Sequence, residues 1–155
     1  MKTILSTLFA LAMSANVFAG SASQPNFIVI YGEGAGWVST SVQMDERNPE
    51  SKGKHAPTPN LERLANAGMV FSDGYAPSPR CTPSRAGLIT GRSPAALHMT
   101  FVNNTPGNRK LLPPNIVMEL PTSEVTIAEQ LKTAGYATAH FGKWHLGMGS
   151  PTLHG

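Results

Sequence analysis

Short apolar runs alternate along this chain with stretches of helical periodicity. Residues 27–31 (FIVIY) form a continuous apolar run that ends in a glycine-rich loop at 32–36, which is typical of a buried strand. Residues 69–71 and 136–141 predict two more strands. Because helices are predicted between these strands, the order indicates an α/β fold with a mostly parallel central sheet.

Two helices are predicted from their end signals. Thr58 is placed to cap a helix that has Pro59 in its first turn and Gly68 as a left-handed last residue. Residues 126–129 (TIAE) form a capping box that starts a second helix, which Gly135 closes. The apolar faces of these helices are expected to be formed by Leu61, Leu64, Ala65, Ile127, Leu131 and Ala134.

The first 19 residues have the pattern of a secretory signal peptide rather than of a folded element. Lys2 supplies the positive region, residues 4–13 are mostly apolar, and residues 17–19 (VFA) have the small-x-small form of a cleavage site. The alternative is a buried N-terminal helix. The pattern predicts an exported protein, periplasmic or extracellular, whose domain begins at residue 20.

Composition narrows the class of protein. Of the 155 residues, 41% are hydrophobic and 14% charged, with a formal net charge of +3 and scattered Lys and Arg. We therefore expect no nucleic-acid partner, and the lack of a long apolar run argues against a stable membrane span. Cys81 is the only cysteine, so it is either an intermolecular partner or a chemically special residue in an exported protein.

The surroundings of Cys81 predict an anion-binding corner. Residues 82–83 (TP) can start a helix that Gly91 ends, with residues 88–89 (LI) facing inward. Cys81 then precedes a helix N-terminus, where free amides favour an anion. Arg85 lies about one helical turn after Cys81, so its guanidinium can donate hydrogen bonds to an anion bound at the same place. The alternative is a buried, inert cysteine.

Several ordered motifs carry a family resemblance. The central one is residues 81–85 (CTPSR), continued by 88–92 (LITGR). The others are residues 25–26 (PN), 58–61 (TPNL), 75–77 (YAP) and 142–147 (GKWHLG). Over residues 25–147 the chain resembles the type I, formylglycine-dependent sulfatases of the alkaline-phosphatase-like superfamily.

The resemblance implies a sulfuric ester hydrolase. Cys81 would be oxidised to formylglycine by a formylglycine-generating or maturase enzyme. One oxygen of the hydrated aldehyde attacks the sulfur of a sulfate ester and expels the alcohol; deprotonation of the second hydroxyl then releases sulfate. Arg85 would orient the diol oxygen, Lys143 would pair with sulfate, and His145 would act as the base. Without the cysteine motif, Lys143 and His145 would be interpreted as a basic pair in a solvated loop.

The metal site departs from the family pattern. The resemblance implies a divalent cation, Ca²⁺ by expectation, held near the nucleophile by two aspartates that align with Glu33 and Gly34. Glu33 and Cys81 are therefore the candidate metal ligands, and the site is expected to be weakened. Family members carry further metal and sulfate ligands well beyond His145, so we expect residues 20–155 to be the N-terminal part of a catalytic domain, inactive alone.

Other functions stay open at this point. The expected substrate is a sulfated small molecule or glycan, and its identity cannot be predicted. The same nucleophile is used by phosphonate monoester and phosphodiester hydrolases. A non-catalytic relative that binds sulfated glycans and a metal-independent cysteine hydrolase are the remaining alternatives.

Overall fold

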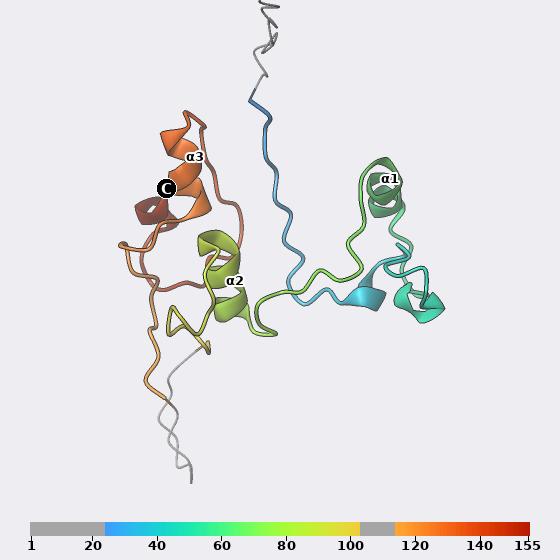
Figure 1. Cartoon of the computed structure of the whole chain (residues 1–155), viewed down its shortest axis with the longest axis horizontal. Helices are drawn as coiled ribbons and strands as arrows, with labels where there is room; N and C mark the ends of the chain where they lie inside the picture. The colour runs from blue at the N-terminus through green and yellow to red at the C-terminus, as the bar shows by residue number, and fades with distance from the viewer. Residues whose placement is uncertain (1–23, 103–113) are drawn as a thin grey trace, which may run out of the picture. The chain divides into compact units, whose positions relative to one another are not determined.

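The computed structural model describes residues 24–102 and 114–155, and its regular elements there are helical (Figure 1). The α-helices are α1 (Pro59–Ala67), α2 (Cys81–Thr90) and α3 (Ile127–Thr133). Short 3₁₀ turns are η1 (Trp37–Ser39), η2 (Pro49–Ser51) and η3 (Pro151–His154). The chain divides after Gly32 into two units, and all of these elements belong to the second, residues 33–155. The predicted signal peptide lies outside the described residues.

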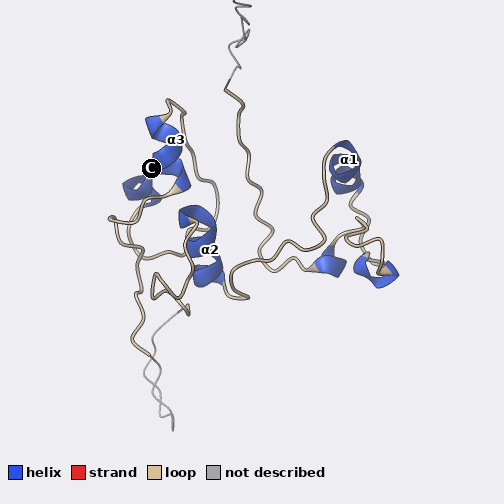
Figure 2. Ribbon diagram, viewed as in Figure 1, coloured by secondary structure: helices blue, strands red, loops and turns tan. Residues whose placement is uncertain are grey.

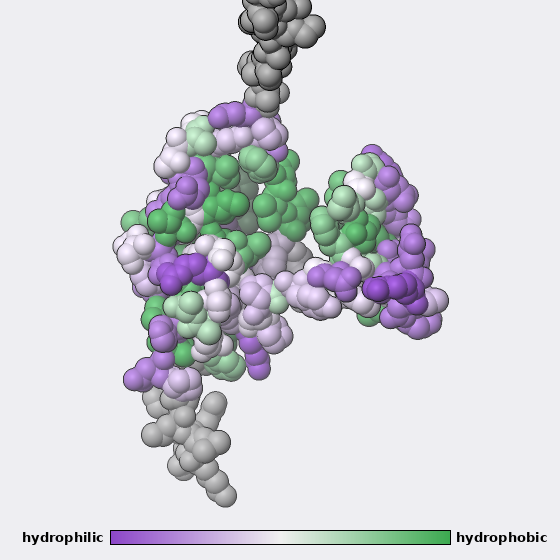
Figure 3. All heavy atoms as spheres, in the orientation of Figure 1, coloured by the Kyte–Doolittle hydropathy of each residue, from purple (hydrophilic) through white to green (hydrophobic). Residues whose placement is uncertain are grey.

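The predicted strands are not confirmed. Residues 27–31, 69–71 and 136–141 are loop, and the part of the chain that the structure describes contains no strand (Figure 2). A strand requires a neighbour to complete its ladder hydrogen bonds, and these segments form no such ladder within the described residues. Their apolar side chains are accordingly exposed at the surface, as for Ile28 at 84% and Phe141 at 91% (Figure 3). The central sheet therefore stays a prediction.

Helix α1 forms where the sequence predicts it, but its ends differ in detail. Thr58 is the N-cap residue, yet its Oγ1 accepts a hydrogen bond from the Ser41 N–H at 2.9 Å instead of capping the helix. Gly68 ends the helix with a φ of −127°, so the predicted left-handed cap is wrong. A Cβ at Gly68 would lie 3.2 Å from the Leu64 carbonyl oxygen, so close approach, not a positive φ, explains a glycine here.

Helix α3 confirms the predicted capping box. Thr126 Oγ1 accepts from the Glu129 N–H at 3.2 Å, and the Glu129 carboxylate accepts from the Thr126 N–H at 2.8 Å. Two of the four amides that the helix start leaves free are thus satisfied. Gly135 follows the helix with a φ of +83°, as predicted.

Helix α2 begins at Cys81, one residue earlier than predicted, and ends at Gly91 as predicted. Gly91 has a φ of +66° and its N–H donates to the Gly87 carbonyl at 2.9 Å. The inward orientation predicted for Leu88 is wrong, because that side chain is 44% exposed. The buried face of α2 is instead built from small residues, Thr82, Pro83, Ser84, Ala86 and Gly87.

The core of the second unit joins α2 to the segment around Leu146. Its buried members are Ala86, Leu97, Met99, Leu120 and Leu146, with Ile89, Val117 and Trp144 packed against them. The Leu120 N–H donates to the Leu146 carbonyl at 2.8 Å, and α2 also contacts α3. This packing fixes the start of α2 beside residues 143–147.

No helix among the described residues has the length and apolarity needed to cross a membrane.

Candidate functional site

The N-terminal turn of α2 is tied to the loop that carries Lys143 and His145. The buried Thr82 hydroxyl donates a hydrogen bond of 3.0 Å to the backbone carbonyl of His145. Thr82 was not singled out from the sequence as a site residue, although a hydroxyl on the buried face of a helix signals a specific partner. This bond brings two distant motifs, residues 81–85 and 142–147, to one place.

Arg85 links three parts of the site. Its Nη1 donates to the backbone carbonyl of Lys143, and its Nη2 forms an ion pair with the Glu33 carboxylate. The Arg85 side chain is 12% exposed and that of Glu33 is 29% exposed, so the guanidinium is shielded from solvent more than the carboxylate is. Because one arm of the guanidinium binds a backbone carbonyl, Arg85 is held in position independently of Glu33.

The Glu33 carboxylate lies between two cations and a thiol. One oxygen pairs with Arg85, the other accepts from Lys143 Nζ at 2.7 Å, and the Cys81 thiol is near enough to affect the pKa of this carboxylate. The hydrogen bond from Arg85, followed by those from Cys81 and Lys143, lowers the pKa of Glu33 from 4.5 to about 2. Reciprocally, the Glu33 carboxylate raises the pKa of Lys143. We call Glu33, Cys81, Arg85 and Lys143 the anion corner.

The His145 side chain does not share the contacts of the anion corner. Its side chain is exposed and forms no hydrogen bond or ion pair with the described residues. Its backbone has a φ of +58°, a left-handed conformation that costs a non-glycine residue about 1 kcal/mol. The Thr82 bond to its carbonyl helps to hold this conformation. Such local strain is typical of residues whose side-chain direction matters.

A divalent cation does not fit the described residues. Both Glu33 oxygens are engaged by cations, and the neighbouring Gly34 has no side chain to offer. Within residues 24–102 and 114–155, no group of three or more His, Cys, Asp or Glu side chains is placed to hold a metal ion. A hard cation takes six or more oxygen ligands and is repelled by Arg85 and Lys143 at this position. The expected ligation by Glu33 and Cys81 is therefore not supported by this geometry.

The other histidines do not join the site. The sequence suggests that His154 is structural or solvated, and the structure places it as structural: it is 4% exposed and its ring lies against Trp144 with the ring centroids 5.5 Å apart. His140 contacts the same indole edge-on, also at 5.5 Å. These rings form a structural cluster around Trp144.

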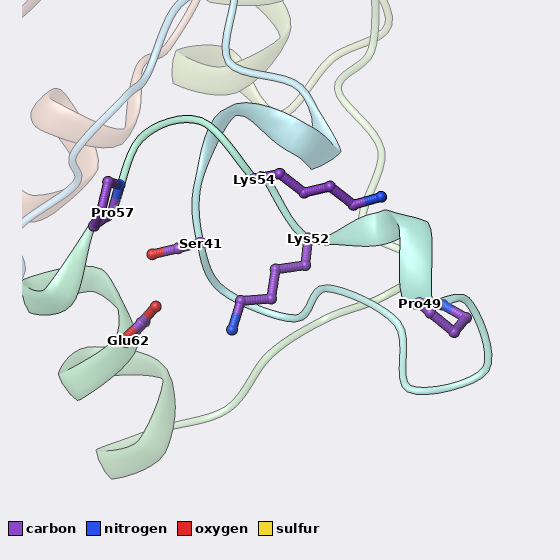
Figure 4. A pocket seen from close by; sticks show the side chains of 7 residues that line it. Ser41, Pro49, Lys52, Lys54, Pro57 and Glu62 are labelled. Atoms are coloured by element: carbon purple, nitrogen blue, oxygen red, sulfur yellow. The ribbon is translucent and has the colours of Figure 1, made fainter.

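A hollow elsewhere in the second unit contributes nothing to the anion corner. It is lined by Ser41, Pro49, Lys52, Gly53, Lys54, Pro57 and Glu62 (Figure 4). Lys54 is already paired with Glu50 at 2.9 Å. The hollow contains no nucleophile positioned beside a base, so the candidate site is the anion corner.

Comparison with known proteins gives consistent matches. The family model described as Sulfatase matches residues 25–152. Arylsulfatase A of Bos taurus is 37% identical over 145 residues, 94% of this chain and 25% of that protein. N-acetylgalactosamine-6-sulfatase of Mus musculus is 37% identical over 153 residues, 99% of this chain and 27% of that protein. N-acetylgalactosamine-6-O-sulfatase of Bacteroides thetaiotaomicron is 46% identical over 92 residues, 59% of this chain and 16% of that protein. The chain thus spans about a quarter of the length of the first two relatives.

Proposed function

The chain belongs to the sulfatase family, and we propose that its anion corner is part of the active site of a sulfuric ester hydrolase. The observation that carries this proposal is the convergence of Arg85 and Lys143 on a single anionic group beside Cys81. Two cations that share one anion can equally hold the oxygens of a sulfate ester.

Each residue of the corner has a proposed role. Converted to formylglycine by a maturation enzyme, position 81 supplies a hydrated aldehyde, whose oxygen is the nucleophile toward sulfur. Arg85 orients that oxygen, since its guanidinium is already anchored to the Lys143 carbonyl. Lys143 pairs with the sulfate oxygens, and its raised pKa keeps it charged. His145 removes a proton in the step that releases sulfate, a general-base role for which the imidazole side chain is commonly used.

The fold and location of the protein are also proposed from the family and the sequence. Residues 27–31, 69–71 and 136–141 are proposed to be strands of the parallel sheet in an alkaline-phosphatase-like α/β fold, because their apolar runs are typical of buried strands. Residues 1–19 are proposed to direct export to the periplasm or the extracellular space. A calcium ion is not assigned a step, because the described residues do not fit one.

The proposed substrate is a sulfate ester of a small molecule or glycan. The names of the relatives specify aryl sulfates and 6-sulfated N-acetylgalactosamine for those proteins. The anion corner does not select between these two substrate classes. In the proposed mechanism Arg85, Lys143 and Cys81 all contact the sulfate group of the ester and not its alcohol part.

Hydrolysis assays test this function. The complete protein, purified from its source rather than as residues 20–155 alone, should release sulfate from an aryl sulfate, and Cys81→Ala and Lys143→Ala should abolish or strongly reduce the rate. Lys132→Ala on α3 removes an exposed lysine outside the corner and should leave the rate unchanged. Faster hydrolysis of a phosphonate monoester than of any sulfate ester would instead assign the phosphonate activity.

The poor fit for a metal favours a second candidate, a non-catalytic relative that binds sulfated glycans. Micromolar glycan binding without sulfate release by protein with formylglycine at position 81 would select it over the hydrolase.

A further inference from the structure

Glu33 is placed as a ligand of the site's own cations. Its two carboxylate oxygens are divided between Arg85 and Lys143, residues 52 and 110 positions away along the chain. A carboxylate that merely solvated a loop would not be held by two cations from distant parts of the chain. The corner therefore already contains an anion, and this anion is part of the polypeptide.

The guanidinium of Arg85 has a second anchor besides Glu33. Arg85 donates to the backbone carbonyl of Lys143, and the loop carrying Lys143 is anchored to α2 through Thr82. Glu33, by contrast, is followed by Gly34, which has a φ of +76° and at which an added Cβ would meet no atom within 4 Å. Removing the carboxylate would thus leave the anchored Arg85 guanidinium facing an open position, with the half-exposed Lys143 ammonium on the neighbouring anchored loop.

We infer that the Glu33 carboxylate is an internal anion that occupies the sulfate-binding position between Arg85 and Lys143, and that sulfate binds there by displacing it. The inference rests on the proposed function for the choice of sulfate as the ligand. Glu33 is then a competitor that weakens anion binding and not a metal ligand. The charges of these groups are consistent with this inference. With Glu33 in place, two cations face one carboxylate, and with Glu33 displaced, both cations face the sulfate oxygens.

Calorimetric titration with inorganic sulfate tests the inference on the full chain with Cys81 kept as a thiol. Glu33→Gln should bind sulfate about tenfold more tightly than wild type, the factor expected if the corner is open about a tenth of the time. Glu124→Gln is the matched control, because Glu124 also pairs with an arginine, Arg92, outside the corner. Its sulfate affinity should equal that of wild type.

Equal or weaker sulfate binding by folded Glu33→Gln overturns the inference. If that variant does not fold, Glu33→Asp keeps the charge but reaches the two cations less well, and its affinity should exceed that of wild type. The inference would also be overturned if wild type bound Ca²⁺ and Glu33→Gln did not. Because the thiol form cannot turn over, these titrations do not depend on hydrolysis. A chain that fails to hydrolyse sulfate esters but shows the predicted affinity change refutes only the proposed function.

Discussion

The hydroxyl of Thr82 donates to the backbone carbonyl of His145 across 63 positions of sequence. This bond connects the helix that begins with Cys81 to the loop that carries Lys143, and Arg85 reinforces the connection through the Lys143 carbonyl. The geometry of the anion corner therefore depends on a residue that is not one of its four members.

Replacement of Thr82 by valine is expected to loosen this connection. Thr82→Val keeps the shape but removes a part-buried hydrogen bond to the His145 carbonyl, which should lower the free energy of unfolding by about 1 kcal/mol. Urea unfolding measures the change. Thr133→Val removes a comparable bond to the Gln130 carbonyl at an exposed position, where water replaces it, so little change is expected. Equal effects of both substitutions would contradict the account.

Gly87 permits close packing of α2 and should not tolerate a side chain. A Cβ there would lie 2.7 Å from Pro77 Cγ, so Gly87→Ala should destabilise the chain by about 1–3 kcal/mol through overpacking. The sign is diagnostic, because alanine normally stabilises a helix interior by about 1 kcal/mol relative to glycine. Gly36→Ala, with open space around it, is the control and should change the free energy by less than about 0.5 kcal/mol.

The capping box of α3 predicts an acid-dependent loss of stability. The hydrogen bond that the Thr126 N–H donates to the Glu129 carboxylate lowers the pKa of Glu129 below its ordinary value of 4.5. Since the folded-state pKa is lowered, the contribution of Glu129 is fully present above about pH 4.5 and is lost as pH falls through the folded-state value. Unfolding free energies measured between about pH 3 and 6 should fall less steeply in Glu129→Gln than in wild type. Glu46→Gln, which removes an exposed carboxylate, should follow the wild-type slope.

The helices were predictable because their signals are local. The capping box at Thr126 and Glu129 and the end of a helix at Gly91 each depend on a few neighbouring residues, and both formed as predicted. The strands were not confirmed, because a ladder depends on partners far along the chain. Gly68 shows the same limit on a smaller scale: its helix-ending role was predictable, but its φ was not.

The sequence predicted which residues belong to the candidate site better than it predicted the contacts between them. Cys81, Arg85 and Lys143 belong to ordered motifs, and the structure brings them together. Glu33 was identified as a candidate metal ligand because it aligns with a metal-binding aspartate of the family. Such an alignment does not show which side chains the carboxylate contacts. Its pairing with Arg85 and Lys143 depends on side-chain distances between residues 52 and 110 positions apart, which no local pattern encodes.

Export predicts a processed N-terminus. Cleavage after Ala19 would make Gly20 the first residue of the protein recovered from its source. N-terminal sequencing or intact-mass measurement checks this, and Val17→Arg, which disrupts the small-x-small site, should block it. An intact Met1 in secreted protein would exclude the signal peptide.

The mass of the tryptic peptide from Cys81 to Arg85, taken from protein purified from its native source, tests the central claim most directly. The account predicts an aldehyde or its hydrate at position 81, because the proposed function requires an oxygen nucleophile there. An intact thiol, in a host shown to convert the cysteine of other sulfatases, would contradict the formylglycine mechanism.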